Sequence, residues 1–199
     1  MSYGFGIIGL GMIAEFHAKA IAAMSGGDLV ACYSRSADKA DAFGQSFGCA
    51  GYSSLDQFLA HKGLDIVTIC TPSGFHLEPA LQAIEAGKHL IVEKPLEVTL
   101  DRCDAMIDAA EKRGVRLAGV FPSRYHEAAA AIKRAVDEGR FGTLTLGDAY
   151  VKWFRTQEYY DNGGWRGTWK YDGGGALMNQ SIHAIDLLQW FMGPVASVQ

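Results

Sequence analysis

The stretch that decides the fold is Phe5-Gly6-Ile7-Ile8-Gly9-Leu10-Gly11-Met12-Ile13-Ala14, where an apolar run meets a glycine-rich turn. Apolar side chains then recur every three or four residues, which predicts a helix after the turn. In such a strand–turn–helix unit, the first glycine permits the tight turn and the second lets the backbone approach a pyrophosphate, while the alanine allows close helix packing. The N–H groups at the helix start can bind the phosphates. We expect a dinucleotide here, a purely structural turn being the alternative; its contacts would be Gly9, Gly11, Met12 and Ile13.

The rest of the first 121 residues repeats this alternation of strand and helix. Five runs are nearly continuous in apolar residues, as in strands that are covered on both faces; they are residues 5–8, 29–33, 66–70, 89–92 and 115–120. Further helical patterns cover residues 36–47, 77–86 and 100–113, and Thr99 is the expected N-cap of the last one. Repeated strand–helix–strand units predict an α/β domain with a doubly wound parallel sheet over residues 1–121.

Residues 122–199 follow a different pattern. Helices are expected at residues 127–138 and 175–191, with a long alternating strand at residues 143–154 between them. The loop at residues 155–174 is rich in aromatic residues and glycine, and structureless loops of that length are uncommon unless they are functional. Because a lone strand cannot form a stable sheet, we expect residues 122–199 to be the incomplete beginning of a second domain, or a part that another chain completes.

Composition narrows the classes of function. Of the 199 residues, 49% are hydrophobic and 20% are charged, and the net charge of −4 gives no general attraction to nucleic acid or acidic membranes. The four cysteines are widely spaced, which predicts neither a disulfide framework nor a metal site. No apolar stretch is long enough to span a bilayer. We expect a cytoplasmic protein whose partner is a small molecule.

The end of the second expected strand bears on the choice of nucleotide. NAD binders usually place a carboxylate there for the ribose 2′-hydroxyl, whereas this sequence has Ser34-Arg35-Ser36. Serine hydroxyls and an arginine guanidinium can bind a 2′-phosphate that a carboxylate would repel. We therefore expect NADP(H) as the preferred cofactor, with NAD(H) possible; the alternative is a solvated loop arginine.

A lysine follows the fourth expected strand, in Glu93-Lys94-Pro95. Ligands of doubly wound sheets bind at the carboxyl ends of the strands. An ammonium group there can bond a substrate hydroxyl and assist removal of its proton as hydride leaves the carbon. The alternative for Lys94 is a surface lysine in a turn.

Several motifs together resemble the glucose–fructose oxidoreductase/inositol dehydrogenase (Gfo/Idh/MocA) family. They are residues 9–14, Thr71-Pro72-Ser73-Gly74-Phe75-His76, residues 87–95 and residues 173–186, and they span nearly the whole chain in the expected order. The resemblance implies a Rossmann domain followed by an α/β domain with an open, mainly antiparallel sheet, used for substrate and for dimer or tetramer contacts. It also implies that Lys94 contacts the reacting hydroxyl and that the Lys94-Pro95 bond is often cis. Further cofactor contacts are expected from Thr71, Pro72, His76 and Glu93.

One position departs from the family pattern. The family often carries an acidic residue four positions before a helical histidine, and the pair handles the proton. His183 matches that histidine, but Asn179 stands where the aspartate is usual. Residues at i and i+4 share a helix face. We therefore expect His183 to transfer the proton alone and Asn179 to orient the substrate or the imidazole; a histidine satisfied by packing is the alternative.

Aromatic and basic residues gather in the loop at residues 155–174 and on both sides of it. Tyrosine and tryptophan offer flat faces to sugar C–H groups, and arginine suits carboxylate or phosphate. A sugar acid or a nucleotide sugar fits this mixture, but a domain or subunit interface is enriched in the same residues. The substrate candidates, together with Asn179 and His183, are Arg124, Tyr125, Trp153, Arg155, Trp165 and Arg166.

The leading hypothesis is an NAD(P)-dependent oxidoreductase that transfers hydride between nicotinamide and a secondary hydroxyl of a sugar, sugar acid, nucleotide sugar or cyclic polyol. Two alternatives remain open. Some relatives retain a tightly bound nicotinamide for sugar elimination or hydrolysis without net oxidation. The same fold can also serve a nucleotide-binding regulatory protein with no activity.

Overall fold

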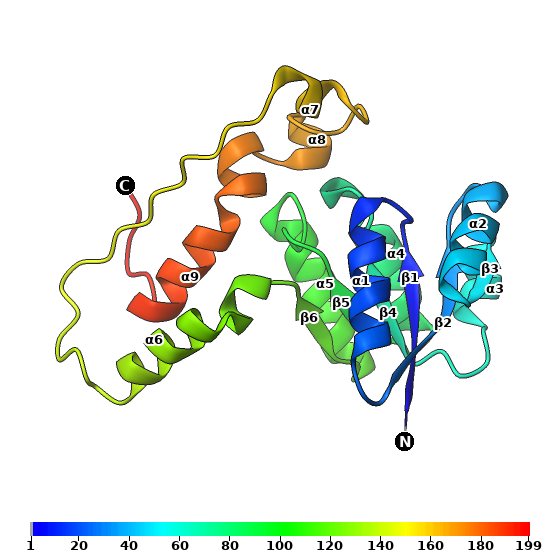
Figure 1. Ribbon diagram of the computed structural model, residues 1–199, viewed down its shortest axis with the longest axis horizontal. Helices are drawn as coiled ribbons and strands as arrows, with labels where there is room; N and C mark the ends of the chain where they lie inside the picture. Colours follow the sequence, from blue (N-terminus) through cyan, green and yellow to red (C-terminus); the bar gives the residue numbers. More distant parts are fainter. Residues whose placement is uncertain (1) are drawn as a thin grey trace. The chain divides into compact units, whose positions relative to one another are not determined.

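The computed structural model describes residues 2–199, which divide into two compact units, one ending at Val120 and the other covering Phe121–Gln199 (Figure 1). The first unit contains a six-stranded sheet in the order β3-β2-β1-β4-β5-β6, and every pair is parallel. Its strands are β1 (Tyr3–Ile8), β2 (Gly27–Tyr33), β3 (Ala50–Tyr52), β4 (Ile66–Ile69), β5 (His89–Val92) and β6 (Leu117–Gly119). The doubly wound parallel sheet is thereby confirmed.

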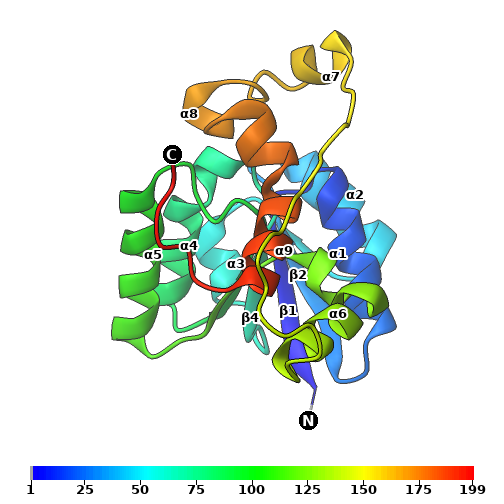
Figure 2. The same cartoon turned by 90° about the vertical axis from the view of Figure 1, so that its left-hand side faces the viewer.

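Helices cover both faces of this sheet, as Figure 2 shows. On one face, α1 and α2 pack over a core that includes Phe5, Ile7 and Phe43. On the other face, α3, α4 and α5 pack over a larger core around Phe58 and Met106. The helices of the unit are α1 (Met12–Ala23), α2 (Ala37–Phe47), α3 (Leu55–Leu59), the 3-10 turn η1 (Ser73–Phe75), α4 (Leu77–Glu85) and α5 (Leu100–Arg113).

The strand order reverses between β1 and its two neighbours, β2 on one side and β4 on the other. The chain leaves β1 for β2 in one direction and later returns to β4 on the opposite side. Connections at such a reversal diverge and leave a crevice at the carboxyl ends of the strands. The turns after β1, β2, β4 and β5 therefore all reach the same edge of the sheet.

Several helix ends in this unit follow capping rules. Ser36 and Ser54 accept hydrogen bonds from backbone N–H groups at the starts of α2 and α3. Gly114 ends α5 in the left-handed conformation, at a φ of 73°. Thr99 is the N-cap residue of α5, as expected, although its side chain makes no capping hydrogen bond.

The second unit is helical over the residues that the structure describes. Its elements are the 3-10 turn η2 (Pro122–Tyr125), α6 (Glu127–Asp137), α7 (Gln157–Asp161), α8 (Trp169–Asp172), the π-helical turn η3 (Ala176–Gln180) and α9 (Ile182–Met192). Helices α6 and α9 pack against each other, and the Arg124–Asp186 ion pair joins η2 to α9.

Three expectations for the second unit need correction. Residues 143–154 do not form a strand, because residues 121–199 contain no neighbouring strand that could pair with them. The expected loop at residues 155–174 contains the short helices α7 and α8. The expected helix at residues 175–191 is divided into η3 and α9. Over residues 2–199, no helix is long and apolar enough to cross a membrane.

Candidate functional site

The turn between β1 and α1 leaves its second glycine open. Gly9 has a φ of 90°, and a Cβ built on it would lie 2.7 Å from the backbone nitrogen of Thr71. A Cβ on Gly11, in contrast, would meet no atom within 4 Å. Gly11 is the N-cap of α1 and supplies no side chain to the N–H groups of the first turn. Ala14 is fully buried beneath the helix. Open space, uncapped N–H groups and a helix N-terminus fit a pyrophosphate.

The turn after β2 carries the residues expected to select the nucleotide. Ser36 caps α2 by accepting the backbone N–H of Lys39 at 3.4 Å, and the Ser34 hydroxyl accepts the backbone N–H of Ser36 at 3.2 Å. Arg35 is exposed beside them. Two further charged residues lie in the first turn of α2: Lys39, a second cation, and Asp38, a carboxylate next to it. The predicted helix start at residue 36 would have placed both side chains beside Arg35.

His76 is placed as a connector between two turns of this edge. Its side chain is almost completely buried, with Nε2 at 2.9 Å from the Thr71 carbonyl and Nδ1 at 3.0 Å from the Pro95 carbonyl. Both ring nitrogens have backbone partners, which fits a structural role for the ring, and a contact between His76 and a cofactor stays a prediction. Its geometry instead holds the turn after β4 to the turn after β5.

The Glu93-Lys94-Pro95 segment follows β5, and its Lys94-Pro95 bond is cis, as the resemblance implied. Glu93 Oε1 lies 2.8 Å from His17 Nε2, and Glu93 Oε2 accepts the Lys94 backbone N–H at 3.1 Å. Burial alone would raise the pKa of Glu93, but the hydrogen bonds from His17 and Lys94 and their charges outweigh it and hold the pKa below its usual value. Glu93 is thus an ionised, buried carboxylate next to Lys94. Both of its carboxylate oxygens have protein partners, and a direct contact with a cofactor stays a prediction.

Sequence analysis missed a second buried carboxylate on this edge, Glu97. Its Oε1 accepts the Leu77 backbone N–H at 3.1 Å and an Arg102 N–H at 2.9 Å, and its Oε2 accepts the Val98 N–H at 2.7 Å. The side chain is fully shielded from solvent. Glu97 therefore ties the start of α4 to the segment after the cis bond. No periodic pattern marks such a residue, because its partners are backbone groups brought together only by folding.

In the second unit, the π-helical turn changes the relation between the two expected catalytic residues. Asn179 lies in η3 and His183 in the first turn of α9, so the simple i, i+4 spacing of one α-helix does not apply. Asn179 is nearly buried, and its Nδ2 donates a hydrogen bond to Asp172 Oδ1. Asp172 Oδ2 accepts the Gly167 backbone N–H at 2.7 Å. A buried carboxylate is therefore present beside position 179, supplied by α8.

Arg124 is held by an internal ion pair. Its Nε and Nη2 atoms lie 2.8 Å and 2.6 Å from the two carboxylate oxygens of Asp186, and its guanidinium stacks 5.4 Å from the centre of the Trp190 ring. The pKa of Arg124 is raised, first by the hydrogen bond to Asp186. This side chain is paired with Asp186 of α9, and its contact with a substrate stays a prediction. Neighbouring Tyr125 is 87% exposed.

The aromatic and basic loop residues gather around Tyr159. The guanidinium carbon of Arg166 lies 4.6 Å from the Tyr159 ring centre and 5.1 Å from that of Trp165. The guanidinium carbon of Arg155 lies 5.4 Å from the Tyr159 ring and 5.7 Å from the Trp153 ring. The structure thus brings together four of the expected substrate residues in one cluster of the second unit.

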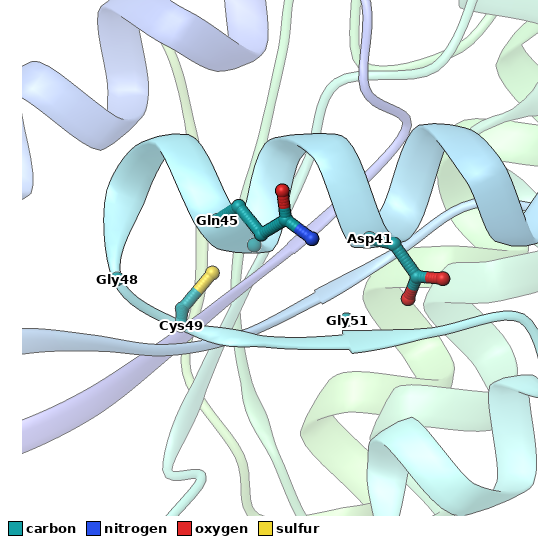
Figure 3. A pocket seen from close by; sticks show the side chains of 6 residues that line it. Asp41, Gln45, Gly48, Cys49 and Gly51 are labelled. Carbon is teal, nitrogen blue, oxygen red and sulfur yellow. The ribbon is translucent and has the colours of Figure 1, made fainter.

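Over the described residues, the structure contains two open hollows, one in each unit. One, of about 370 Å³, is lined by the second half of α2 and the start of β3; Figure 3 shows Asp41, Gln45 and Cys49 at its wall. It contains none of the expected site residues. The other, of about 470 Å³, is lined by apolar residues of the second unit, among them Trp169, Leu177 and Ile185. Neither hollow offers the charged groups that a phosphate-bearing ligand requires.

Two family models match the chain. One, described as an oxidoreductase family with an NAD-binding Rossmann fold, covers residues 3–121, and the other, the GFO/IDH/MocA C-terminal domain, covers residues 129–199. The chain belongs to the GFO/IDH/MocA family. The expected resemblance is thereby confirmed, and with it an NAD-binding Rossmann domain in the first unit.

Individual GFO/IDH/MocA relatives agree. A WlbA dehydrogenase from Bordetella pertussis, solved in complex with NADH and UDP-GlcNAcA, is 37% identical with a TM-score of 0.92, over 98% of this chain and 56% of that one. D-glucoside 3-dehydrogenase of Escherichia coli is 31% identical, over 94% of this chain and 53% of its own length. Glucose-6-phosphate 3-dehydrogenase of Bacillus subtilis is 29% identical, over 94% of this chain and 53% of its own length. The chain therefore spans about half the length of the curated relatives it matches.

Proposed function

We propose that this chain carries the cofactor site of a nicotinamide-dependent oxidoreductase acting on a secondary hydroxyl of a sugar-like substrate. The observation that supports it most directly is the open Gly11 turn at the uncapped start of α1, on the sheet edge where Lys94 follows β5. When bound, NAD(P) supplies the hydride acceptor or donor. The backbone N–H groups of Met12 and Ile13 would hold its pyrophosphate.

Lys94 is proposed as the catalytic residue of the first unit, with its ammonium bonding the reacting hydroxyl. For the second unit, His183 is proposed as a group that transfers the proton, because it matches the family histidine. The Lys94→Ala variant should lose turnover and keep cofactor binding, and Lys62→Ala, an exposed lysine of the same unit, is the control. Unchanged turnover in Lys94→Ala would overturn the assignment.

Product formation without net change in the cofactor would favour the elimination or hydrolysis reaction, and binding without turnover would favour the regulatory protein.

We propose NADP(H) as the preferred cofactor. Arg35, with the Ser34 hydroxyl and the Lys39 ammonium at the start of α2, provides cations and donors for a 2′-phosphate, against the opposing charge of Asp38. The test is a fluorescence titration with NADPH and NADH at fixed salt. Arg35→Ala should weaken NADPH binding about tenfold and leave NADH binding nearly unchanged. The control is Arg116→Ala, an exposed arginine just before β6 at the opposite edge of the sheet. Tighter binding of NADH to the wild type would exclude this preference.

For the substrate we propose a sugar acid or a nucleotide sugar. The B. pertussis relative was solved with UDP-GlcNAcA, and the cluster of Arg155, Arg166 and Trp165 around Tyr159 offers cations and flat rings for such a ligand. Turnover should be compared between UDP-GlcNAcA and the nucleotide sugar that carries a hydroxymethyl group in place of the carboxylate. Equal rates would remove the preference for an acid. The cluster also suits an interface, so we propose a homo-oligomer as well, which light scattering tests.

A further inference from the structure

A chain of hydrogen bonds runs beneath Lys94 through three elements of the first unit. Thr68 Oγ1 of β4 lies 2.7 Å from His17 Nδ1 of α1, and His17 Nε2 lies 2.8 Å from Glu93 Oε1. The other Glu93 oxygen accepts the Lys94 backbone N–H at 3.1 Å. Thr68 is 1% exposed, and the side chains of His17 and Glu93 are 15% and 11% exposed. Within these hydrogen bonds, the imidazole connects α1 to the Lys94 turn.

One arrangement of protons satisfies every contact in the chain. The imidazole donates from Nε2 to the Glu93 carboxylate, and its Nδ1 shares a hydrogen bond with the Thr68 hydroxyl. The carboxylate then has both oxygens occupied, one by the ring and one by the Lys94 amide. A carboxylate oriented in this way fixes the backbone of the residue that follows it. The same order, in which one buried group aligns a second and the second holds the reacting group, is found in other catalytic constellations.

The charged and titratable groups around the imidazole come from each packed element. Glu93 and Lys94 follow β5, and the Cys70 thiol, which lies 3.8 Å from Thr68 Oγ1, follows β4. Burial raises the pKa of that thiol to about 12, so it remains neutral. His17 therefore faces one negative charge, that of Glu93, whose position it controls.

We propose that His17 is a positioning residue for Lys94, acting through Glu93 and held in place by Thr68. This inference rests on the proposed function of Lys94, and it adds to it a residue of α1. It requires that the loss of the His17–Glu93 contact lowers the rate of the chemical step and leaves the cofactor and substrate affinities largely intact. The proposed cofactor contacts lie in the turns after β1 and β2, and the proposed substrate contacts lie in the second unit.

The decisive comparison is between His17→Leu and His17→Gln. Leucine removes the donor to Glu93 at similar volume, whereas the glutamine amide can still donate to the carboxylate. We expect kcat to fall about tenfold in His17→Leu and to lie within about threefold of wild type in His17→Gln. KM should change by less than about twofold in both variants. Thr68→Val should lower kcat to an intermediate degree, since the ring loses one of its two supports.

Two controls separate positioning from general damage. His61→Leu removes another partly buried histidine of the same unit, bonded to Tyr52 at 2.8 Å. This control should lower Tm about as much as His17→Leu does and leave kcat unchanged. The Lys94→Ala variant tests the proposed function itself. Lost turnover in Lys94→Ala together with wild-type kcat in His17→Leu would overturn the inference and keep the proposed function.

A measurement without turnover keeps the inference testable if the chain proves inactive. Hydrogen exchange of the Lys94 amide, followed by NMR against the Ile91 amide of β5, should accelerate at least about tenfold in His17→Leu and remain slow in His17→Gln. An unchanged Lys94 amide in His17→Leu would overturn the positioning role. Equal acceleration in both variants would overturn it too, because the donor to Glu93 would then not matter.

Discussion

Two glycines of one turn serve different purposes, although the sequence pattern gives them the same weight. Gly9 is required by the fold, because its φ is positive and a Cβ would collide with the Thr71 backbone. Gly11 has an ordinary φ of −92° and open space around it. No feature of the folded chain itself demands a glycine there. The space is therefore available for a ligand that approaches the backbone.

This difference predicts opposite results for the two alanine variants. Gly9→Ala should destabilise the protein by about 2 kcal/mol or more, since strain and a backbone collision add. Gly11→Ala should leave the free energy of unfolding within about 1 kcal/mol of wild type and weaken NADH binding about tenfold or more, because the methyl group occupies the space of the pyrophosphate. Urea denaturation and fluorescence titration measure the two quantities. A Gly11→Ala variant that binds NADH normally would contradict the proposed cofactor site.

Glu97 predicts a pH dependence of stability. Burial would raise the pKa of this carboxyl, but the hydrogen bonds from Arg102, Val98 and Leu77 outweigh it and hold the pKa below its ordinary value of 4.5. The folded state therefore favours the ionised form. The resulting stability is present above about pH 4.5 and is lost as the pH falls through the lower, folded-state pKa.

The Glu97→Gln variant should lose roughly 2–3 kcal/mol of stability at pH 7. The gap from wild type should narrow as the pH falls below about 4.5, because the carboxyl of the unfolded wild type then takes up a proton, and it should close only below the folded-state pKa, where the folded carboxyl is neutral as well. Urea unfolding between pH 3 and pH 8 measures both curves. The exposed Glu111→Gln serves as the control for loss of charge on the surface, and a constant gap across this range would contradict the prediction.

At the scale of elements, α8 and η3 explain the departure from the family pattern at position 179. Asp172 of α8 accepts a hydrogen bond from Asn179 of η3 in a buried setting. An aspartate at position 179 would place two carboxylates against each other with little solvent between them. An amide at this position avoids that repulsion and keeps the pair hydrogen-bonded.

We therefore expect Asn179→Asp to be destabilising at neutral pH by about 2 kcal/mol or more, and to recover stability on acidification, when one carboxyl of the pair is protonated. The double variant Asp172→Asn with Asn179→Asp should restore most of the loss, since it exchanges the two partners. Thermal unfolding of the four proteins of this cycle gives the coupling directly. Additive losses in the double variant would show that the two side chains do not interact.

The elements that could be predicted are those whose pattern is long and local. Strands at residues 5–8, 29–33 and 89–92 and the helix at residues 100–113 follow from apolar runs and helical spacing. β3 has three residues and α3 has five, too few to establish a period. The π-helical turn η3 was not predicted; its Asn179 is hydrogen-bonded to Asp172, seven positions earlier in the chain. The His17–Glu93 contact, between residues 76 positions apart, likewise arises from the strand order.

At the scale of the whole molecule, residues 143–155 differ from everything before them. Among the described residues they form no backbone–backbone hydrogen bond, and they expose Leu146, Tyr150 and Phe154 at 77%, 79% and 83%. Proteolysis concentrates where backbone is unprotected. In a limited chymotrypsin digest, we expect the first cuts after Tyr150 or Phe154, well before any cut within β1–β6. Mass spectrometry of the early fragments checks this, and a first cut in the Rossmann domain would contradict it.

Every group proposed to hold the cofactor or to position Lys94 comes from the first 102 residues, within a unit that has its own two-sided core. Specificity for the substrate, in contrast, is proposed for residues that follow Phe121. Natural selection can therefore act on these two tasks almost independently. Descendant genes can keep the cofactor-binding domain unchanged and vary only the later segment. A new metabolic role then requires few substitutions in the part of the protein that is hardest to alter without unfolding it.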